Sequence, residues 1–236
     1  MTVVEADIHP LDQTAWASLN GPHARFAEGA GRARRYPVDV SPIVAVPPVQ
    51  DEQVWADLAA LVGPGARSLL AGDLSPRPAG WTVEFVGDGV QLVATDALES
   101  RPAAGLVTLG AADVPEMLDL VARTKPGPFQ PRTYQMGTYL GVRHQGALVA
   151  MAGERLHPPG WTEISAVCTD PAHRGRGLAT TLVRAVAHNI RQRGETPFMH
   201  ASRDNVNAVR LYQSIGFELR RSVLFTALRS PGGTKP

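Results

Sequence analysis

The stretch "CTDPAHRGRGLATTLVRAVAHNI", residues 168–190, contains the strongest local pattern in the chain. A proline-marked turn leads to two glycines that alternate with arginines, and apolar residues at helical spacing follow at once. Glycines let a backbone approach a ligand closely, and the N–H groups at the start of a helix attract anions. Arginines add charged donors that suit phosphate oxygens. The stretch therefore predicts a strand, a loop and a helix that together bind an anion of the phosphate type.

Two common phosphate-binding motifs do not fit this loop. A Walker loop ends in Gly-Lys followed by Ser or Thr, which this loop lacks. A dinucleotide-binding loop needs a small residue three positions after Gly177, where Thr180 stands. It also needs an acidic residue after the next strand, and the strand pattern "PFMHAS" ends in Ser202. The spacing that the loop does contain is R-x-x-G-x-A, from Arg174 to Ala179.

The elements around the loop alternate between strand and helix patterns. Strand patterns cover residues 67–72, 81–87, 90–95, 105–110, 138–156 (a hairpin turning at 144–146), 162–169, 197–202 and 218–228. Helix patterns cover residues 51–62, 112–124, 177–192 and 205–217. This order predicts an α/β fold with a mixed sheet. Weak periodicity over residues 96–105 predicts a boundary there, between an N-terminal α/β domain (1–100) and a second domain (104–230).

Composition narrows the class of protein. The net charge of +1 gives no general reason to expect nucleic acid or an anionic membrane as partner, and no apolar run approaches a membrane span. The start "MTVVEADIHP" lacks the basic and apolar regions of a signal peptide, so we expect a cytoplasmic protein. With one cysteine and scattered histidines, the sequence predicts no intrachain disulfide and no metal site.

A second motif lies downstream of the loop, with Asn205, Ala208, Leu211, Tyr212 and the pair Gly216-Phe217 at fixed spacing. Together with R-x-x-G-x-A, it resembles the two signature motifs of the GNAT N-acetyltransferase superfamily. Residues 106–228 further resemble the branch related to glycine N-acyltransferase. The resemblance implies a GNAT fold, with a mixed, mostly antiparallel sheet and flanking helices. It also makes residues 1–100 a candidate degenerate GNAT-like half.

The resemblance implies a site for acetyl-CoA. The loop and the helix start would hold the pyrophosphate, while the preceding strand and the second motif would hold the pantetheine arm. The implied cofactor-binding residues are Val167, Cys168, Thr169, Arg174, Gly175, Arg176, Gly177, Leu178, Ala179, Thr180, Asn205, Ala208 and Tyr212. Cys168 should otherwise act as a small buried hydrophobe, since no activating base lies beside it in the sequence.

Direct acyl transfer needs a proton for the leaving thiolate and a base for the amine. Tyr212 stands at the tyrosine position of the second motif and is the predicted general acid. Strand alternation places Glu163 on the same face as Ser165, Val167 and Thr169, unless a bulge intervenes, so Glu163 is the first candidate base. Glu154 and His200 are the alternatives, and bulk water is another.

The proline-rich loop "PGPFQPRT", residues 126–133, lies where GNAT enzymes close over the acceptor. Phe129, Arg132 and Tyr134 are the candidate acceptor-binding residues, joined by His200, and Arg132 suits a carboxylate. The sequence thus predicts an enzyme that acetylates an amine, most simply that of a small molecule or amino acid. Two alternatives stay open: a non-catalytic acyl-CoA-binding module and a protein or peptide N-acetyltransferase. A homodimer is also left open.

Overall fold

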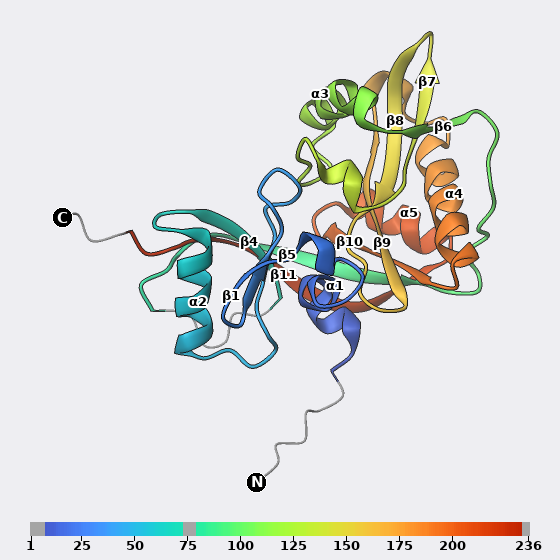
Figure 1. The fold of residues 1–236 in the computed structure, drawn as a ribbon. Helices are drawn as coiled ribbons and strands as arrows, with labels where there is room; N and C mark the ends of the chain where they lie inside the picture. The colour runs from blue at the N-terminus through green and yellow to red at the C-terminus, as the bar shows by residue number, and fades with distance from the viewer. Residues whose placement is uncertain (1–7, 73–78, 233–236) are drawn as a thin grey trace.

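The computed structural model describes residues 8–72 and 79–232, and its largest element is an eight-stranded sheet (Figure 1). The strand order is β4-β11-β5-β10-β9-β8-β7-β6. The pair β9–β10 is parallel, and all other neighbours in the sheet are antiparallel. The strands are β4 (Arg67–Ala71), β5 (Thr82–Ala94), β6 (Leu106–Leu109), β7 (Tyr139–His144), β8 (Ala147–Glu154), β9 (Trp161–Thr169), β10 (Thr196–Ser202) and β11 (Phe217–Arg229).

Helices cover both faces of this sheet, as the sequence predicts. Figure 1 shows α3 (Val114–Thr124) and α4 (Leu178–Gln192) on opposite sides of the β7–β8 hairpin. One apolar cluster joins α4 and α5 (Val206–Ser214) to β5, β8 and β10, and a second joins α3 to β7 and β8. Among the described residues, no helix has the length and apolar character needed to cross a membrane. The α/β fold with a mixed, mostly antiparallel sheet and flanking helices is confirmed.

The N-terminal part carries elements of its own. A small sheet is formed by β1 (Glu28–Ala30), β2 (Ala33–Arg35) and β3 (Val44–Ala45), and α2 (Glu52–Val62) packs on it. Asp51 caps α2 by accepting a hydrogen bond from the Val54 N–H at 3.0 Å. The helix α1 (Thr14–Leu19) and short 3-10 turns complete this part. Those turns, with three later ones, are Pro10–Gln13, Ala24–Phe26, Ala111–Asp113, Thr133–Met136 and Pro171–His173.

The two parts share one sheet and one core. β5, which precedes residue 100, lies between β10 and β11, and β4 pairs with β11. Leu11 and Tyr36 belong to the same apolar cluster as Met136, Leu156 and Phe198. The predicted boundary near residue 100 thus falls on a connection between strands of one sheet. The division into residues 1–100 and 104–230 stays a prediction.

The strand β9 contains a bulge that changes which side chains share a face. Ala166 has φ +52, and the register with β8 shifts between the pairs Gly153–Ser165 and Met151–Cys168. Consequently Val167 packs on the α4 side, whereas Cys168 packs on the α3 side. Simple alternation placed Cys168 away from Glu163, and the bulge reverses this. Cys168 is buried, and burial raises the pKa of its thiol.

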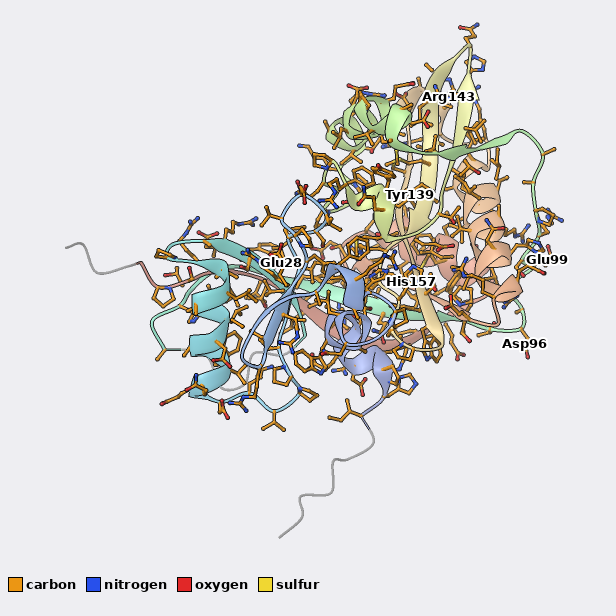
Figure 2. The ribbon with its side chains drawn as sticks, in the orientation of Figure 1. Glu28, Asp96, Glu99, Tyr139, Arg143 and His157 are labelled. Atoms are coloured by element: carbon orange, nitrogen blue, oxygen red, sulfur yellow. The ribbon has the colours of Figure 1, made fainter. Side chains whose placement is uncertain are left out.

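A cluster of buried titratable groups ties the N-terminal part to the end of β8. The rings of His23 and His157 lie 4.7 Å apart, and His23 hydrogen-bonds to the Tyr36 hydroxyl and the Met136 carbonyl, each at 3.0 Å. Figure 2 shows His157 at the centre of the molecule, among the elements that these residues join. Burial and the neighbouring His157 lower the pKa of His23 to about 3, while burial and Arg193 lower that of His157 to about 4.

These two histidines should make stability fall in mild acid. Both stay neutral in the folded protein, whereas the unfolded chain binds their protons once the pH drops below about 6.5. Stability is therefore full above that pH and is lost as the pH falls towards the folded values. We expect each histidine to cost about 2 kcal/mol between pH of about 6.5 and about 5. Urea unfolding across this range should show the loss, and His157→Gln should halve it; an unchanged slope would contradict the assignment. Glu154 changes the stability in the opposite direction. Burial raises its pKa, so the folded protein binds this proton more readily than the unfolded chain and gains stability as the pH falls.

Candidate active site

A cavity of about 740 Å³ opens where the parallel strands β9 and β10 diverge. The two strands pair over three residues only, ending at Phe198–Glu163, and beyond that point both line the cavity. Residues 164–169 form one wall and residues 199–202 the other, and residues of β4, β5, β11 and α5 close the space. A gap between parallel strands exposes backbone N–H and C=O groups, so the cavity can hold an extended ligand by main-chain hydrogen bonds.

The glycine loop lies beside this cavity, between β9 and α4. Gly175 and Gly177 have φ of +75 and +73, and a Cβ added at either would meet no atom within 4 Å. Gly177 is the N-cap of α4 and supplies no side-chain cap, and the first helical bond runs from the Thr181 N–H to its carbonyl. The N–H groups of residues 178–180 are thus left for an external acceptor. The open cradle and the bare helix start fit a diphosphate.

The remaining cofactor-binding candidates divide between cavity and loop. The structure brings Val167, Cys168, Thr169 and Arg174 to the cavity, while Arg176 is exposed on the loop and Leu178, Ala179 and Thr180 form the first turn of α4. The Thr169 hydroxyl is buried without a hydrogen-bond partner among the described residues. A buried, unpartnered hydroxyl in a cavity wall is suited to hydrogen-bonding a ligand.

The helix α5 places Asn205, Ala208 and Tyr212 on the cavity. Asn205 caps α5 by accepting from the Ala208 N–H at 3.2 Å, which leaves its side-chain NH₂ available. Tyr212 is buried, with 7% of its surface exposed, and burial raises its pKa to about 12. The phenol therefore keeps its proton at neutral pH, as a general acid must.

Glu163 does not have the environment of a base. Its carboxylate is fully buried and accepts from Arg155 at 2.9 and 2.6 Å and from His200 Nδ1 at 2.8 Å. Although burial alone would raise the pKa of Glu163, the charge of Arg155 and these hydrogen bonds hold it well below its usual range. Glu163 is also absent from the described residues that line the cavity. A carboxylate stabilised in this way orients its neighbours rather than taking a proton.

His200 is held in one orientation, and it lines the cavity. The Gln91 side-chain oxygen accepts from Arg220 at 2.8 Å, and its nitrogen donates to the Leu11 carbonyl at 2.8 Å. Because this fixes the amide, the second Gln91 N–H points to His200 Nε2, 3.1 Å away. His200 thus donates from Nδ1 to Glu163 and accepts at Nε2 from Gln91. Because Nε2 has one lone pair, it can take a proton only when the Gln91 hydrogen bond is given up.

Glu154 lies elsewhere, at the end of β8. Its carboxylate accepts from Arg193 at 3.1 Å and from the Thr138 N–H at 3.4 Å, and His157 Nε2 lies 3.6 Å away. It is outside the set of described residues that line the cavity. The structure therefore gives no support to Glu154 as the base of this site.

The expected acceptor-binding residues of the proline-rich loop do not reach the cavity. Phe129 packs edge-on against Tyr139, with ring centroids 5.5 Å apart, because it belongs to the core beneath α3. Arg132 is engaged by Asp39 at 3.1 Å, and Tyr134 packs partly buried on the same core. The start of the loop, residues 124–128, lines the cavity instead.

The far wall comes from residues that the sequence did not indicate. Ile43, Leu69, Phe85 and Phe225 line it, together with the partly buried Arg155. The wall depends on the pairing of β4 and β5 with β11, partners more than a hundred residues apart along the chain. Among these residues, only Arg155 could have been indicated by a local pattern. It directly follows β8, and its partner Glu163 lies 8 residues later in the chain.

Comparison with known proteins places this geometry in a family. The family described as FR47-like protein matches residues 139–226. N-alpha-acetyltransferase RimI of Mycobacterium tuberculosis is 33% identical over 126 residues, which cover 48% of this chain and 78% of RimI. Mycothiol acetyltransferase of Kocuria rhizophila is 32% identical over 52% of this chain, but the match spans only 39% of that protein.

A solved structure matches almost the whole chain. A protein from Novosphingobium aromaticivorans, assigned to the GNAT family of acetyltransferases, is 38% identical, with a TM-score of 0.86, and the match covers 97% of this chain and all of that one. The narrower resemblance to the glycine N-acyltransferase branch stays a prediction. The match to RimI and the full-length match to the solved structure agree with the loop, the diverging strands and the cavity: the chain belongs to the GNAT family of acetyltransferases.

Proposed function

We propose that this chain transfers an acetyl group from acetyl-CoA to the amine of a small molecule. The observation that carries the proposal is that Thr169, Tyr212 and His200 all line one cavity, next to the bare start of α4. The names of the relatives support acetyl transfer, and the open cradle at Gly175 and Gly177 supports a diphosphate-bearing donor. The bound donor supplies an acetyl thioester and a thiolate leaving group.

The chain's own residues bind the donor and move protons around the reacting carbon. The N–H groups of residues 178–180 hold the diphosphate, and the exposed edge of β9 beyond the bulge holds the pantetheine arm and polarises the thioester carbonyl. The amine nitrogen forms a bond to the carbonyl carbon as the carbon–sulfur bond breaks. One amine proton passes to His200 Nε2, directly or through a water, once the acceptor has displaced the Gln91 N–H from that nitrogen. The Tyr212 phenol gives its proton to the departing sulfur. Proton return from imidazolium to phenolate through water resets the site.

His200 replaces Glu163 as the proposed base because of how the two residues are arranged. Glu163 accepts from His200 Nδ1, so an imidazolium formed at His200 lies against a buried carboxylate. Phe198 and Phe225 flank the ring edge-on, with centroids 5.6 and 5.8 Å away, and they limit its movement. Glu163 is then a positioning residue that acts through His200.

His200→Ala should lower kcat by about a hundredfold while leaving the affinity for acetyl-CoA unchanged, since general-base groups contribute on that scale. Initial rates of free-thiol release and calorimetric titration with coenzyme A measure the two quantities. Added imidazole should restore part of the lost rate by filling the space of the missing ring. If imidazole restores nothing while the variant remains folded, the amine loses its proton to water alone.

Thiol release from acetyl-CoA in the presence of an amine panel tests the function itself. The panel should include free amino acids, simple alkyl and aryl amines and a peptide with a free N-terminus. Release that depends on an amine, with an acetylated product seen by mass spectrometry, is the expected result. Tight binding of coenzyme A with no transfer to any amine would instead identify an acyl-CoA-binding module. Transfer to the peptide alone would favour the kind of activity that the name of RimI states.

A further inference from the structure

The charge around the cavity is unbalanced. Arg67, Lys125, Arg155 and Arg174 line it, and among the described residues no aspartate or glutamate does. A cavity of this kind disfavours acceptors with a second cationic group, because like charges in a partly enclosed site repel strongly. It favours an acceptor that brings a negative charge. Resting on the proposed function, this charge pattern therefore bears on which amine the enzyme accepts.

Three of these cations either pair with a carboxylate or lie in the loop that is proposed to bind the diphosphate. Arg155 binds Glu163 through two hydrogen bonds. Arg67 lies 3.0 Å from Glu84, and Arg174 stands in the loop that faces the diphosphate, with its Nε donating to the Thr169 carbonyl. Lys125 differs, because it forms no ion pair with any other described residue and is exposed at the cavity. Its charge is available for a ligand.

The position of Lys125 is itself unusual. It ends α3 with φ 49 and ψ 54, a left-handed conformation that glycine or asparagine normally adopts and that other residues adopt at some cost. Its N–H still donates to the Val121 carbonyl at 2.7 Å, so the backbone there is fixed. Gly127, with φ 133, follows, and Pro126 and Pro128 stiffen the segment. A lysine is thus anchored on a rigid rim of the cavity.

The wall built from β4, β5 and β11 is mostly apolar, although Arg67 and Thr226 also line it. Leu69, Phe85 and Phe225 contribute to it, and Ile43 from the N-terminal part joins them. Gly89 makes room for this wall, because a Cβ there would lie 2.2 Å from the Phe225 ring. An acceptor that fits both features carries an apolar or aromatic body and an anionic group near its amine.

We infer that the acceptor is an α-amino acid with an apolar side chain, and that Lys125 binds its carboxylate. Lys125, rather than Arg132 as the sequence predicted, is then the residue that binds the acceptor carboxylate. L-phenylalanine, L-phenylalanine amide and phenethylamine form a matched set, because they share the aromatic body and the amine and differ at the carboxylate. The wild-type enzyme should favour L-phenylalanine over both others by at least about tenfold in kcat/KM, the effect of one charge-assisted pair.

Lys125→Ala should remove this preference and Lys125→Glu should reverse it, with the KM for acetyl-CoA unchanged in both. Arg123→Ala is the control, since Arg123 is an exposed cation two residues earlier, paired with Asp119 and Asp170 and outside the cavity lining. Equal rates for the three amines in the wild type, or an effect of Lys125→Ala on acetyl-CoA alone, would overturn the inference. Equal rates for the acid and its amide would point to a peptide N-terminus. Thiol release with no amine at all would contradict the proposed function as well.

Discussion

Replacing Gly177 by glutamate should abolish the binding of acetyl-CoA while leaving the protein folded. Gly177 has φ +73, a conformation that costs a residue with a side chain roughly 1–2 kcal/mol. The larger effect is electrostatic. The new carboxylate would occupy the open cradle in front of the α4 N-terminus, where the N–H groups of residues 178–180 await an anion. It would satisfy those donors and repel the diphosphate, and like-charge juxtaposition of this kind costs several kcal/mol.

The expected loss in affinity is therefore more than about a hundredfold, measured by calorimetric titration with coenzyme A. Gly146→Glu is the matched control. Gly146 has φ +86 in the β7–β8 turn, and a Cβ there would also meet no atom within 4 Å. The two variants should lose similar stability in thermal unfolding, yet only Gly177→Glu should lose the ligand. Unchanged binding by Gly177→Glu would remove the loop from the site and would leave the donor assignment without its main support.

Local patterns in the sequence were sufficient for the elements of this loop. The predicted helix 177–192 is α4, Leu178–Gln192, and the hairpin predicted to turn at residues 144–146 turns there, with Gln145 and Gly146 in left-handed conformations. Each of these two elements depends on residues that are close in sequence, namely apolar residues at helical spacing and glycines with positive φ. The motif that gives Tyr212 and Asn205 is equally local, and both residues line the cavity.

The face of each residue along β9 could not be predicted in the same way. Alternation assumes an unbroken register, and one left-handed residue, Ala166, interrupts it. Alanine does not favour the left-handed conformation as glycine and asparagine do, so nothing in "TEISAVCT" indicates the bulge. It places Val167 and Cys168 on opposite sides from those that alternation assigns.

The environment of Glu163 could not be predicted for a different reason. The sequence shows a glutamate in the right strand, but whether it can act as a base depends on its partners. Arg155 reaches it from the preceding connection and His200 from the next strand.

Contacts distant in sequence also explain why the strand patterns 81–87 and 90–95 form the single strand β5. Gly87 and Gly89 interrupt the pattern there because the rings of Phe85 and Phe225 occupy the space beside them.

Tyr212→Phe should lower kcat by about a hundredfold with the affinity for acetyl-CoA almost unchanged, because the change removes only the proton that the leaving thiolate needs. The structure records no hydrogen bond from the Tyr212 hydroxyl to another described residue, so its loss leaves no buried partner unsatisfied. Stability should therefore stay within about 0.5 kcal/mol of the wild type. Tyr134→Phe is the control, since its hydroxyl accepts from Gln135 at 3.3 Å outside the cavity.

The result separates the two roles that a buried tyrosine on this helix could have. Tyr212 packs beside Phe217, with ring centroids 6.4 Å apart, and phenylalanine preserves that contact. A tyrosine that only packs would thus give a variant with normal turnover. A tyrosine that donates its proton would give slow turnover with normal binding, because a phenol with a pKa of about 12 is replaced by a ring with no proton to give. Measuring kcat by thiol release beside the Kd for coenzyme A distinguishes the two, and full activity in Tyr212→Phe would assign the acid to water.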